Sequence, residues 1–327
     1  MTKIAVDLMG GDNAPKAIEE GIIQAADTFD DIEILAFGMP GSYSGNHPRV
    51  TFIEVTEKIE SEDDPVKSVR RKKDSSLVRA VKAVADGEAD AIVSAGNTGA
   101  IMSAGLFGVK RIKGIERPAI TTMLPTTSGK GMLMLDMGAN SENKPNHLLQ
   151  FAQMASVYME NIEGRKNPSI GLINNGSEEI KGTELTKETY QLLKNSGLNF
   201  AGFFETRDIL TGNIDIAVTD GFTGNVVLKT IEGTSSSLLG EVKKIMLKNP
   251  VNKLAALAMK NDFAELKNML DYRQFGGAPL MGLQGNVIKA HGSSDATAIV
   301  NAVKQAKIMA DSGTIDKIKD LIGEDNE

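Results

Sequence analysis

The sequence predicts an α/β fold with a largely parallel sheet and helices on both of its faces. Short apolar segments alternate with segments of helical periodicity along most of the 327 residues. Several apolar segments are continuous runs, as strands buried on both faces should be. Because alternating strands and helices favour parallel pairing, the connections are expected to cross back over the sheet. A chain of this length can also bury a large core without covalent staples.

Ten short segments are expected to be strands: 3–8, 32–37, 50–55, 91–95, 119–124, 132–136, 170–173, 200–204, 214–219 and 287–290. Five segments between or after them carry apolar side chains at helical spacing: 15–26, 75–85, 145–161, 183–196 and 295–309. In the first of these helices, Ile18, Ile22 and Ala25 fall on one face. That face is expected to pack against the sheet.

Residues 223–272 depart from the alternation, because their pattern is helical almost throughout. Proline cannot sit inside a helix without losing a hydrogen bond, so Asn249-Pro250 marks a turn, and we predict a helical hairpin. The apolar residues at its lysine-rimmed tip are Leu254, Leu257 and Met259. The tip is a core or subunit contact, or a contact with a membrane surface or an apolar partner. The length of the chain allows about two domains or one large α/β unit, and in either case this hairpin would project from it.

Composition excludes several functional classes. There is no cysteine, which removes disulfides, cysteine-ligated zinc, iron–sulfur clusters and thiolate nucleophiles. Three histidines make a multi-histidine metal site unexpected, and we predict no metal. A net charge of −7 and the absence of tryptophan argue against nucleic acid as a ligand. Asp7 interrupts the first apolar run, and no run reaches about 18 apolar residues, so we expect a cytoplasmic protein.

The ends of the expected strands carry the most functional information. Six glycine-containing polar loops follow or accompany strand ends: 10–15, 94–99, 136–140, 174–177, 219–225 and 291–295. Helix starts after such loops attract anions, and ligands of open α/β sheets bind beyond the carboxyl ends of strands. The chain has no P-loop, no G-x-G-x-x-G after its first strand and no G-x-S-x-G elbow. The sequence therefore predicts a cleft for a small anion or a substrate phosphate.

Three charged features admit two interpretations each. Lys181 is either a helix-face lysine or a cationic group of the site. His291, at a strand end beside Gly292, is either structural or a proton donor or anion contact. The basic run of 67–73 is either a solvated helix face or a docking surface for an acidic partner or a phosphate.

Eight motifs occur together and in order: VDLMGGDNAP (6–15), VRRKKDSSL (69–77), IVSAGNTGA (92–100), RPAI (117–120), LDMGAN (135–140), EEIKG (178–182), DIAVTDGFTGNVVLK (215–229) and KAHGSSDA (289–296). This set resembles the PlsX family of acyl-ACP:phosphate acyltransferases, which form acyl-phosphate for bacterial phospholipid synthesis. The resemblance implies a three-layer α/β/α sandwich, isocitrate/isopropylmalate dehydrogenase-like and phosphotransacetylase-like, usually a homodimer and peripheral to the membrane. It also favours a single α/β unit over residues 1–327, with an interdomain-like cleft and the projecting hairpin at 223–272. It implies no cofactor of the enzyme itself, because phosphate is a substrate and the phosphopantetheine belongs to ACP.

For such a reaction, phosphate needs desolvation and positioning more than it needs a strong base. We assign its binding to the turn of Asn97, Thr98 and Gly99, with help from Ser293 and Ser294. Two other classes stay open. One is a metal- and NAD(P)-dependent decarboxylating dehydrogenase on the same fold, and the other is a scaffold that binds ACP or lipid without turnover.

The remaining roles follow from the charge that develops during acyl transfer. Asn225 and nearby backbone N–H groups are candidates to stabilise the tetrahedral oxyanion. Lys181 or His291 would meet the departing thiolate, or Lys181 would be acylated transiently, and Asp220 would orient one of them. The acidic ACP would dock on Arg70, Arg71, Lys72 and Lys73.

Overall fold

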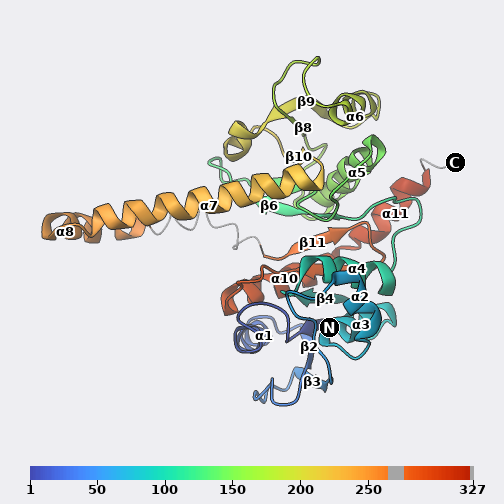
Figure 1. The fold of residues 1–327 in the computed structure, drawn as a ribbon, viewed down its shortest axis with the longest axis vertical. Coiled ribbons are helices and arrows are strands. Elements are labelled where there is room, and N and C mark those ends of the chain that lie inside the picture. The colour runs from blue at the N-terminus through green and yellow to red at the C-terminus, as the bar shows by residue number, and fades with distance from the viewer. Residues whose placement is uncertain (264–275, 325–327) are drawn as a thin grey trace.

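The computed structural model describes residues 1–263 and 276–324, which form two β-sheets covered by helices (Figure 1). The seven-stranded sheet contains β1 (Thr2–Asp7), β2 (Ile32–Gly38), β3 (Val50–Glu54), β4 (Ala91–Ser94), β5 (Ala119–Ile120), β11 (Ala278–Met281) and β12 (Asn286–Lys289). Its strand order is β3-β2-β1-β4-β12-β11-β5. The first five strands in this order are parallel, whereas β11 is antiparallel to both of its neighbours.

The five-stranded sheet contains β6 (Thr122–Leu124), β7 (Met132–Leu135), β8 (Ile170–Asn174), β9 (Phe200–Glu205) and β10 (Ile216–Val218). Its order is β6-β7-β10-β8-β9, and every pairing except β6 with β7 is parallel. Both sheets are therefore built mainly from strand–helix–strand connections, which places the carboxyl ends of their parallel strands at one edge of each sheet.

The helices are α1 (Lys16–Thr28), α2 (Pro65–Arg71), α3 (Ser76–Ala85), α4 (Thr98–Gly108), α5 (Pro145–Asn161), α6 (Glu184–Lys194), α7 (Gly221–Met246), α8 (Pro250–Ala258), α10 (Ala296–Ser312) and α11 (Thr314–Glu324). A short 3-10 helix spans Thr206–Thr211. Helices α1 and α10 pack against one another and cover one face of the seven-stranded sheet, and α3 and α4 cover the other face.

Burial on both faces explains why the strands are apolar throughout. Ile4 and Val6 of β1 belong to one core cluster with α1 and α10, while Ala5 belongs to the cluster with α3 and α4. The same period of two places Leu133 in the first cluster and Met134 in the second. Each cluster contains residues of both sheets, so the apolar core continues from one sheet to the other.

The predicted α/β class is confirmed, but the structure has two sheets where the sequence predicts one. The expected strand 119–124 divides at Thr121, whose backbone N–H donates to the carbonyl of Pro279 at 3.0 Å. As a result β5 pairs in the seven-stranded sheet and β6 in the five-stranded sheet. Strand β11 was not predicted from the sequence. It is short and contains Pro279, which cannot donate a ladder hydrogen bond.

Helix α7 is 26 residues long and projects from the body of the molecule, with α8 at its far end (Figure 1). The predicted break is present: α7 ends at Met246, and α8 begins at Pro250 with Asn249 as its cap. Leu254, Leu257 and Met259 are 74%, 69% and 47% exposed. The rest of the expected hairpin, 264–272, lies outside the described residues, and the single-unit organisation stays a prediction. Within the described part of the chain, no helix is both long and apolar enough to cross a membrane.

Candidate functional site

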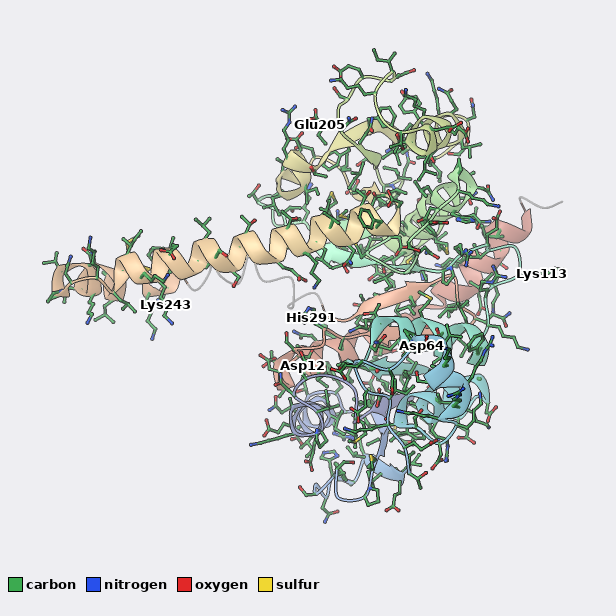
Figure 2. The ribbon with its side chains drawn as sticks, viewed as in Figure 1. Asp12, Asp64, Lys113, Glu205, Lys243 and His291 are labelled. Atoms are coloured by element: carbon green, nitrogen blue, oxygen red, sulfur yellow. The ribbon has the colours of Figure 1, made fainter. Side chains whose placement is uncertain are left out.

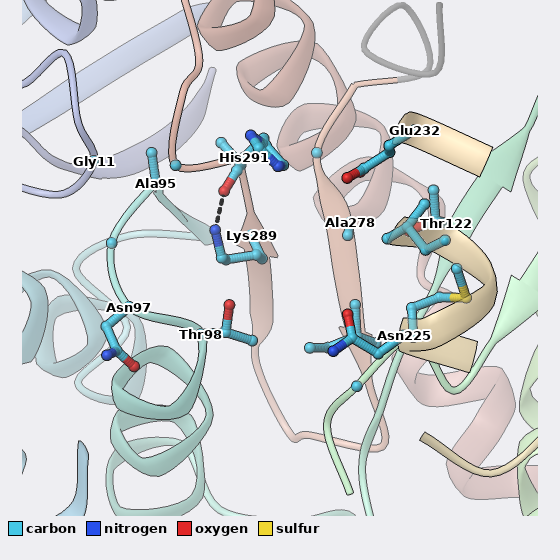
Figure 3. Close-up of a pocket in the computed structure, with 18 of the residues that line it drawn as sticks. Gly11, Ala95, Asn97, Thr98, Thr122, Asn225, Glu232, Ala278, Lys289 and His291 are labelled. Atoms are coloured by element: carbon cyan, nitrogen blue, oxygen red, sulfur yellow. Dashed lines mark hydrogen bonds between the residues drawn. The ribbon is translucent and has the colours of Figure 1, made fainter. Parts of the chain in front are cut away.

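A cavity of about 550 Å³ lies where the loops of the two sheets meet (Figure 3). Five of the six glycine-containing loops contribute to its lining. They supply Gly11 and Asp12, Ala95 to Thr98, Met137 and Gly138, Asn225, and His291 and Gly292. The sixth loop, 174–177 after β8, does not reach it. An apolar part of the wall consists of Ile120, Met123, Met137, Leu228 and Ala278.

Lys289 is the chief cation of this cavity. It is the last residue of β12, and its ammonium donates to the carbonyl of Ala290 (Figure 3). Burial, aided by the nearby charge of Lys229, lowers the pKa of Lys289 to about 8. An ammonium that is partly withdrawn from water is unfavourable unless an anion accompanies it, so this position favours an anionic ligand.

His291 follows Lys289 and joins the same wall. Its Nδ1 lies 2.8 Å from the Ser293 hydroxyl, and its Nε2 lies 3.5 Å from the Lys229 ammonium. Burial lowers the pKa of His291, and the charges of Lys229 and Lys289 act in the same direction. The negative charges of Glu232 and Asp12 raise the pKa of His291 and so oppose this effect. Asp12 and His291 are both labelled in Figure 2. The imidazole is therefore mainly neutral at neutral pH and can accept a proton.

Helix α7 presents three polar residues to the cavity from one face. Asn225, Lys229 and Glu232 are spaced at i, i+4 and i+7, which places them on the same side of the helix. The Lys229 ammonium lies 2.7 Å from Glu232 Oε2, so this carboxylate helps to place the lysine. Sequence reasoning missed Lys229, Glu232 and Lys289. The helical spacing and a lysine inside an apolar strand were the signals that could have found them.

The start of α4 forms the opposite wall. Asn97 caps this helix by accepting from the N–H of Ala100 at 3.1 Å, and its amide donates to the carbonyl of Ser61 at 2.9 Å. Thr98 lines the cavity, but Gly99 does not. A Cβ at Gly99 would lie 2.8 Å from Pro65 Cγ, so its small size permits α2 to pack here. The unshared N–H groups of the first turn of α4 add positive potential.

A buried hydrogen-bond network holds the loop before α4. Asp7 accepts from the Ser94 hydroxyl at 2.7 Å, and Ser94 in turn accepts from the N–H of Gly96 at 3.1 Å. Burial raises the pKa of Asp7, against these hydrogen bonds. A Cβ at Gly10 would lie 2.6 Å from Asp7 Oδ2 and 2.7 Å from the nitrogen of Gly96. The two glycine loops therefore touch because neither carries a side chain at that point.

Asp136, after β7 of the five-stranded sheet, is a second carboxylate whose hydrogen bonds hold a loop of the cavity wall. One carboxylate oxygen accepts from the N–H groups of Ile120, Gly138 and Ala139, at 2.9 to 3.2 Å. The other accepts from the backbone and the side-chain amide of Asn140, at 2.9 and 2.7 Å. This buried carboxylate thus holds Gly138 in the cavity wall. Gly224 packs directly on the carbonyl of Asp136, which brings the first turn of α7 close.

Comparisons with known proteins place the chain in a family. The family model described as "Fatty acid synthesis protein" matches residues 2–317. The phosphate acyltransferase of Staphylococcus aureus (strain Newman) is 49% identical over 328 residues and covers 100% of both chains, and that of strain bovine RF122 / ET3-1 has the same identity and coverage. The chain belongs to the fatty acid synthesis protein family. It is an acyltransferase, and the resemblance to the PlsX family is confirmed.

Solved structures share the fold of this family member. The branched-chain phosphotransacylase of Enterococcus faecalis V583 matches with a TM-score of 0.62 at 12% identity, covering 95% of this chain and 99% of that one. A phosphotransacetylase from Streptococcus pyogenes matches with a TM-score of 0.59 at 17% identity, covering 94% of each. A 4-hydroxythreonine-4-phosphate dehydrogenase from Klebsiella pneumoniae matches at 0.52 and 13% identity, covering 95% and 98%. These matches confirm the phosphotransacetylase-like fold.

Of the residues expected to bind phosphate in the acyltransferase, Asn97 and Thr98 line the cavity and Gly99 does not. Ser293 and Ser294 also lie outside its lining. Ser293 is exposed and contacts His291, whereas Ser294 is buried, and its hydroxyl has no hydrogen-bond partner among the described residues. These serines therefore shape the loop after β12 rather than the cavity surface.

Of the four expected catalytic residues, His291 and Asn225 line the cavity, and Lys181 and Asp220 do not. Lys181 follows β8, and its ammonium pairs with Glu178 Oε1 at 2.9 Å. Asp220 caps α7 by accepting from the N–H of Thr223 at 2.9 Å. The structure thus gives Asp220 a capping contact, and it separates Lys181 from the cavity because the loop after β8 does not reach it.

The four basic residues expected to dock ACP have different surroundings in the structure. The Lys72 ammonium pairs with Asp63 at 2.5 Å, and the Lys73 ammonium donates to the carbonyl of Val69 at 3.3 Å. Arg71 is exposed, and the Arg70 guanidinium lies 4.9 Å from the centre of the Phe107 ring. Lys72 is therefore neutralised within the protein, while Arg70 belongs to a surface that also contains an exposed aromatic ring.

Proposed function

We propose that this acyltransferase transfers a fatty acyl group from acyl-ACP to inorganic phosphate, giving acyl-phosphate for phospholipid synthesis. The observation that carries the proposal is the composition of one cavity. It combines the cations Lys289 and Lys229, a helix start and an apolar wall. The names of the relatives, phosphate acyltransferases, support the same acceptor.

Phosphate would bind between Lys289, Lys229 and the first turn of α4. The Lys289 ammonium has no carboxylate within 4.0 Å in the described part of the chain, so a bound dianion would supply the missing counter-charge. Two lysines and helix N–H groups together favour the dianionic form of phosphate. That form is the nucleophile the reaction needs, and the cavity removes part of its hydration.

The acyl carbonyl would lie between the phosphate and the apolar wall. A phosphate oxygen attacks the thioester carbon, a carbon–oxygen bond forms, and the carbon–sulfur bond then breaks. Asn225 faces the cavity from α7 and would donate to the oxyanion of the tetrahedral intermediate. The proton of the phosphate hydroxyl passes to neutral His291 and then to the departing sulfur, which leaves as a thiol.

This reaction requires no cofactor bound by the enzyme. The sulfur belongs to the carrier and the nucleophile is a phosphate oxygen, which agrees with a chain that lacks cysteine. The expected homodimer is part of the proposal, and light scattering of the purified protein would test it.

We also infer that the tip of the hairpin contacts the inner face of the membrane, so that the protein is cytoplasmic and peripheral. Leu254, Leu257 and Met259 are largely exposed at the far end of the projecting arm, and Lys253 and Lys260 flank them. Exposed apolar side chains with a basic rim are typical of surfaces that bind anionic lipid.

The decisive assay is the release of the carrier thiol from acyl-ACP with and without inorganic phosphate. We expect release that depends on phosphate and is accompanied by acyl-phosphate, detected as a hydroxamate after hydroxylamine treatment. A matched reaction with sulfate in place of phosphate controls for ionic strength. Thiol release at the same rate in both solutions would contradict the proposed acceptor.

A further inference from the structure

A second hollow, of about 610 Å³, lies beside the catalytic cavity. We call it the α4 groove, and it is lined by Met102, Leu106, Phe107, Arg111, Glu116, Arg117, Pro118, Ala139, Asn140, Lys144 and His147. Three chain segments line both hollows. Helix α4 contributes Thr98 to the cavity and Met102 to the groove. The loop after β7 contributes Gly138 to the cavity and Ala139 to the groove. The third segment runs from Pro118 in the groove to Ile120 in the cavity.

The α4 groove is basic on a protein of net charge −7. Arg111, Arg117 and Lys144 line it, and among the described residues of its lining Glu116 supplies the one carboxylate. That carboxylate is occupied, because Glu116 accepts from the Asn146 amide at 2.5 Å and lies 3.0 Å from His147 Nε2. The positive charge of the groove is therefore not neutralised from within the lining.

An aromatic anchor stands at the edge of the groove. Phe107 is 46% exposed, and the guanidinium of Arg70 lies over its ring. Exposed aromatic rings combined with arginines are enriched in the centres of protein–protein interfaces, where arginine also recognises carboxylates in pairs of hydrogen bonds. Lys113, which lies between the groove residues Arg111 and Glu116 in sequence, is on the side of the molecule away from projecting α7 (Figure 2). A partner here would leave the hairpin tip accessible.

We propose that the α4 groove docks an acidic protein surface, that of the carrier which delivers the acyl thioester to the cavity. This inference rests on the proposed function. Thr98 and Phe107 are nine residues apart on α4, which places the aromatic edge of the groove about 14 Å along the helix from the cavity wall. A carrier bound at the groove would therefore need an extended arm to place its thioester at the cavity, which is how a pantetheine thioester is presented.

Charge reversal tests the docking surface. The variants are R117E and K144E, and the matched control is K187E, which makes the same charge change on the exposed face of α6. We would measure the dissociation constant of fluorescently labelled acyl carrier protein by anisotropy at low ionic strength. Each groove variant should weaken binding by about tenfold or more, because an attraction becomes a repulsion, and K187E should leave binding unchanged. Added salt should weaken wild-type binding more than that of R117E.

Phosphate-dependent thiol release completes the test. At saturating carrier, R117E and K144E should retain the wild-type kcat within about threefold, since the loss lies in the KM for the carrier. Groove variants that bind the carrier as tightly as wild type, or a control that loses as much affinity as they do, would overturn the docking proposal. Wild-type enzyme that binds the carrier but releases no thiol with phosphate would overturn the proposed function and leave the docking result standing.

Discussion

Replacing Lys289 by methionine should make the protein more stable and nearly inactive. Methionine preserves the length and apolar stem of the side chain and removes its charge. Burial holds the pKa of Lys289 at about 8, against an ordinary value of 10.5. At about 1.4 kcal/mol per pH unit, that interval corresponds to about 3 kcal/mol by which the folded protein disfavours the charged form.

The sign of the pH dependence follows from proton counting. Between pH 8 and 10.5 the unfolded chain holds more protons on this lysine than the folded chain does, so wild-type stability from Lys289 rises with pH. At pH 7 the full penalty is present in wild type and absent from Lys289→Met. The variant should therefore gain up to about 3 kcal/mol at pH 7, and the difference should vanish above pH 10.5.

Thermal unfolding in a phosphate-free buffer would measure this gain. At about 2.1 cal/mol/K per residue, 3 kcal/mol corresponds to an increase of about 4 °C in Tm for this chain. Lys187→Met, on the exposed face of α6, is the matched control and should leave Tm unchanged. Added phosphate at tenfold its Kd should stabilise wild type by about 1.4 kcal/mol and the variant by much less.

Activity should change in the opposite direction from stability. The kcat/KM for phosphate should fall by at least about 100-fold in Lys289→Met, because the variant loses the half-buried cation that would face the dianion. A variant less stable than wild type at pH 7, or one still stabilised by phosphate to the wild-type extent, would refute the reasoning. The combination expected here is the trade-off between site function and stability that buried charges produce.

Three other predictions follow from the positions of single residues. Lys181→Ala should retain activity within threefold in the thiol-release assay, because this side chain lies outside the cavity. A hundredfold loss of activity would show that Lys181 takes part in the reaction. Gly224→Ala should lower the free energy of unfolding by about 1–3 kcal/mol or more, because the added Cβ would overlap the carbonyl of Asp136. The control Gly233→Ala, on the same helix, has open space around the added Cβ and should leave stability unchanged or raise it by about 1 kcal/mol. Replacing Leu254 and Leu257 together by glutamate should abolish sedimentation with anionic liposomes and leave turnover in solution unchanged, and equal sedimentation of variant and wild type would exclude this tip as the contact.

Local periodicity was enough to predict most of the elements. The helix expected over 145–161 has those bounds in the structure, and the turn expected at Asn249-Pro250 separates α7 from α8. The failures concern pairing between segments distant in sequence. The division of 119–124 at Thr121 and the existence of β11 depend on Pro279, which lies about 160 residues away from that division. The pattern of apolar residues within one segment carries no information about a pairing with a segment so far away in the chain.

Residue types and their spacing were enough to predict the class of site. Glycine and small polar residues after apolar strands specify loops that can approach a ligand, and five of those six loops do line one cavity. Which charged residues enter this cavity depends on contacts between elements that are distant in the chain. Lys289 is half-buried in the cavity at the end of β12, whereas Lys181, also a lysine after a strand, pairs with Glu178 elsewhere. Residue type sets what a side chain can do, but its burial and counter-charge come from elements that are distant in the chain, and these determine the pKa and the ligand.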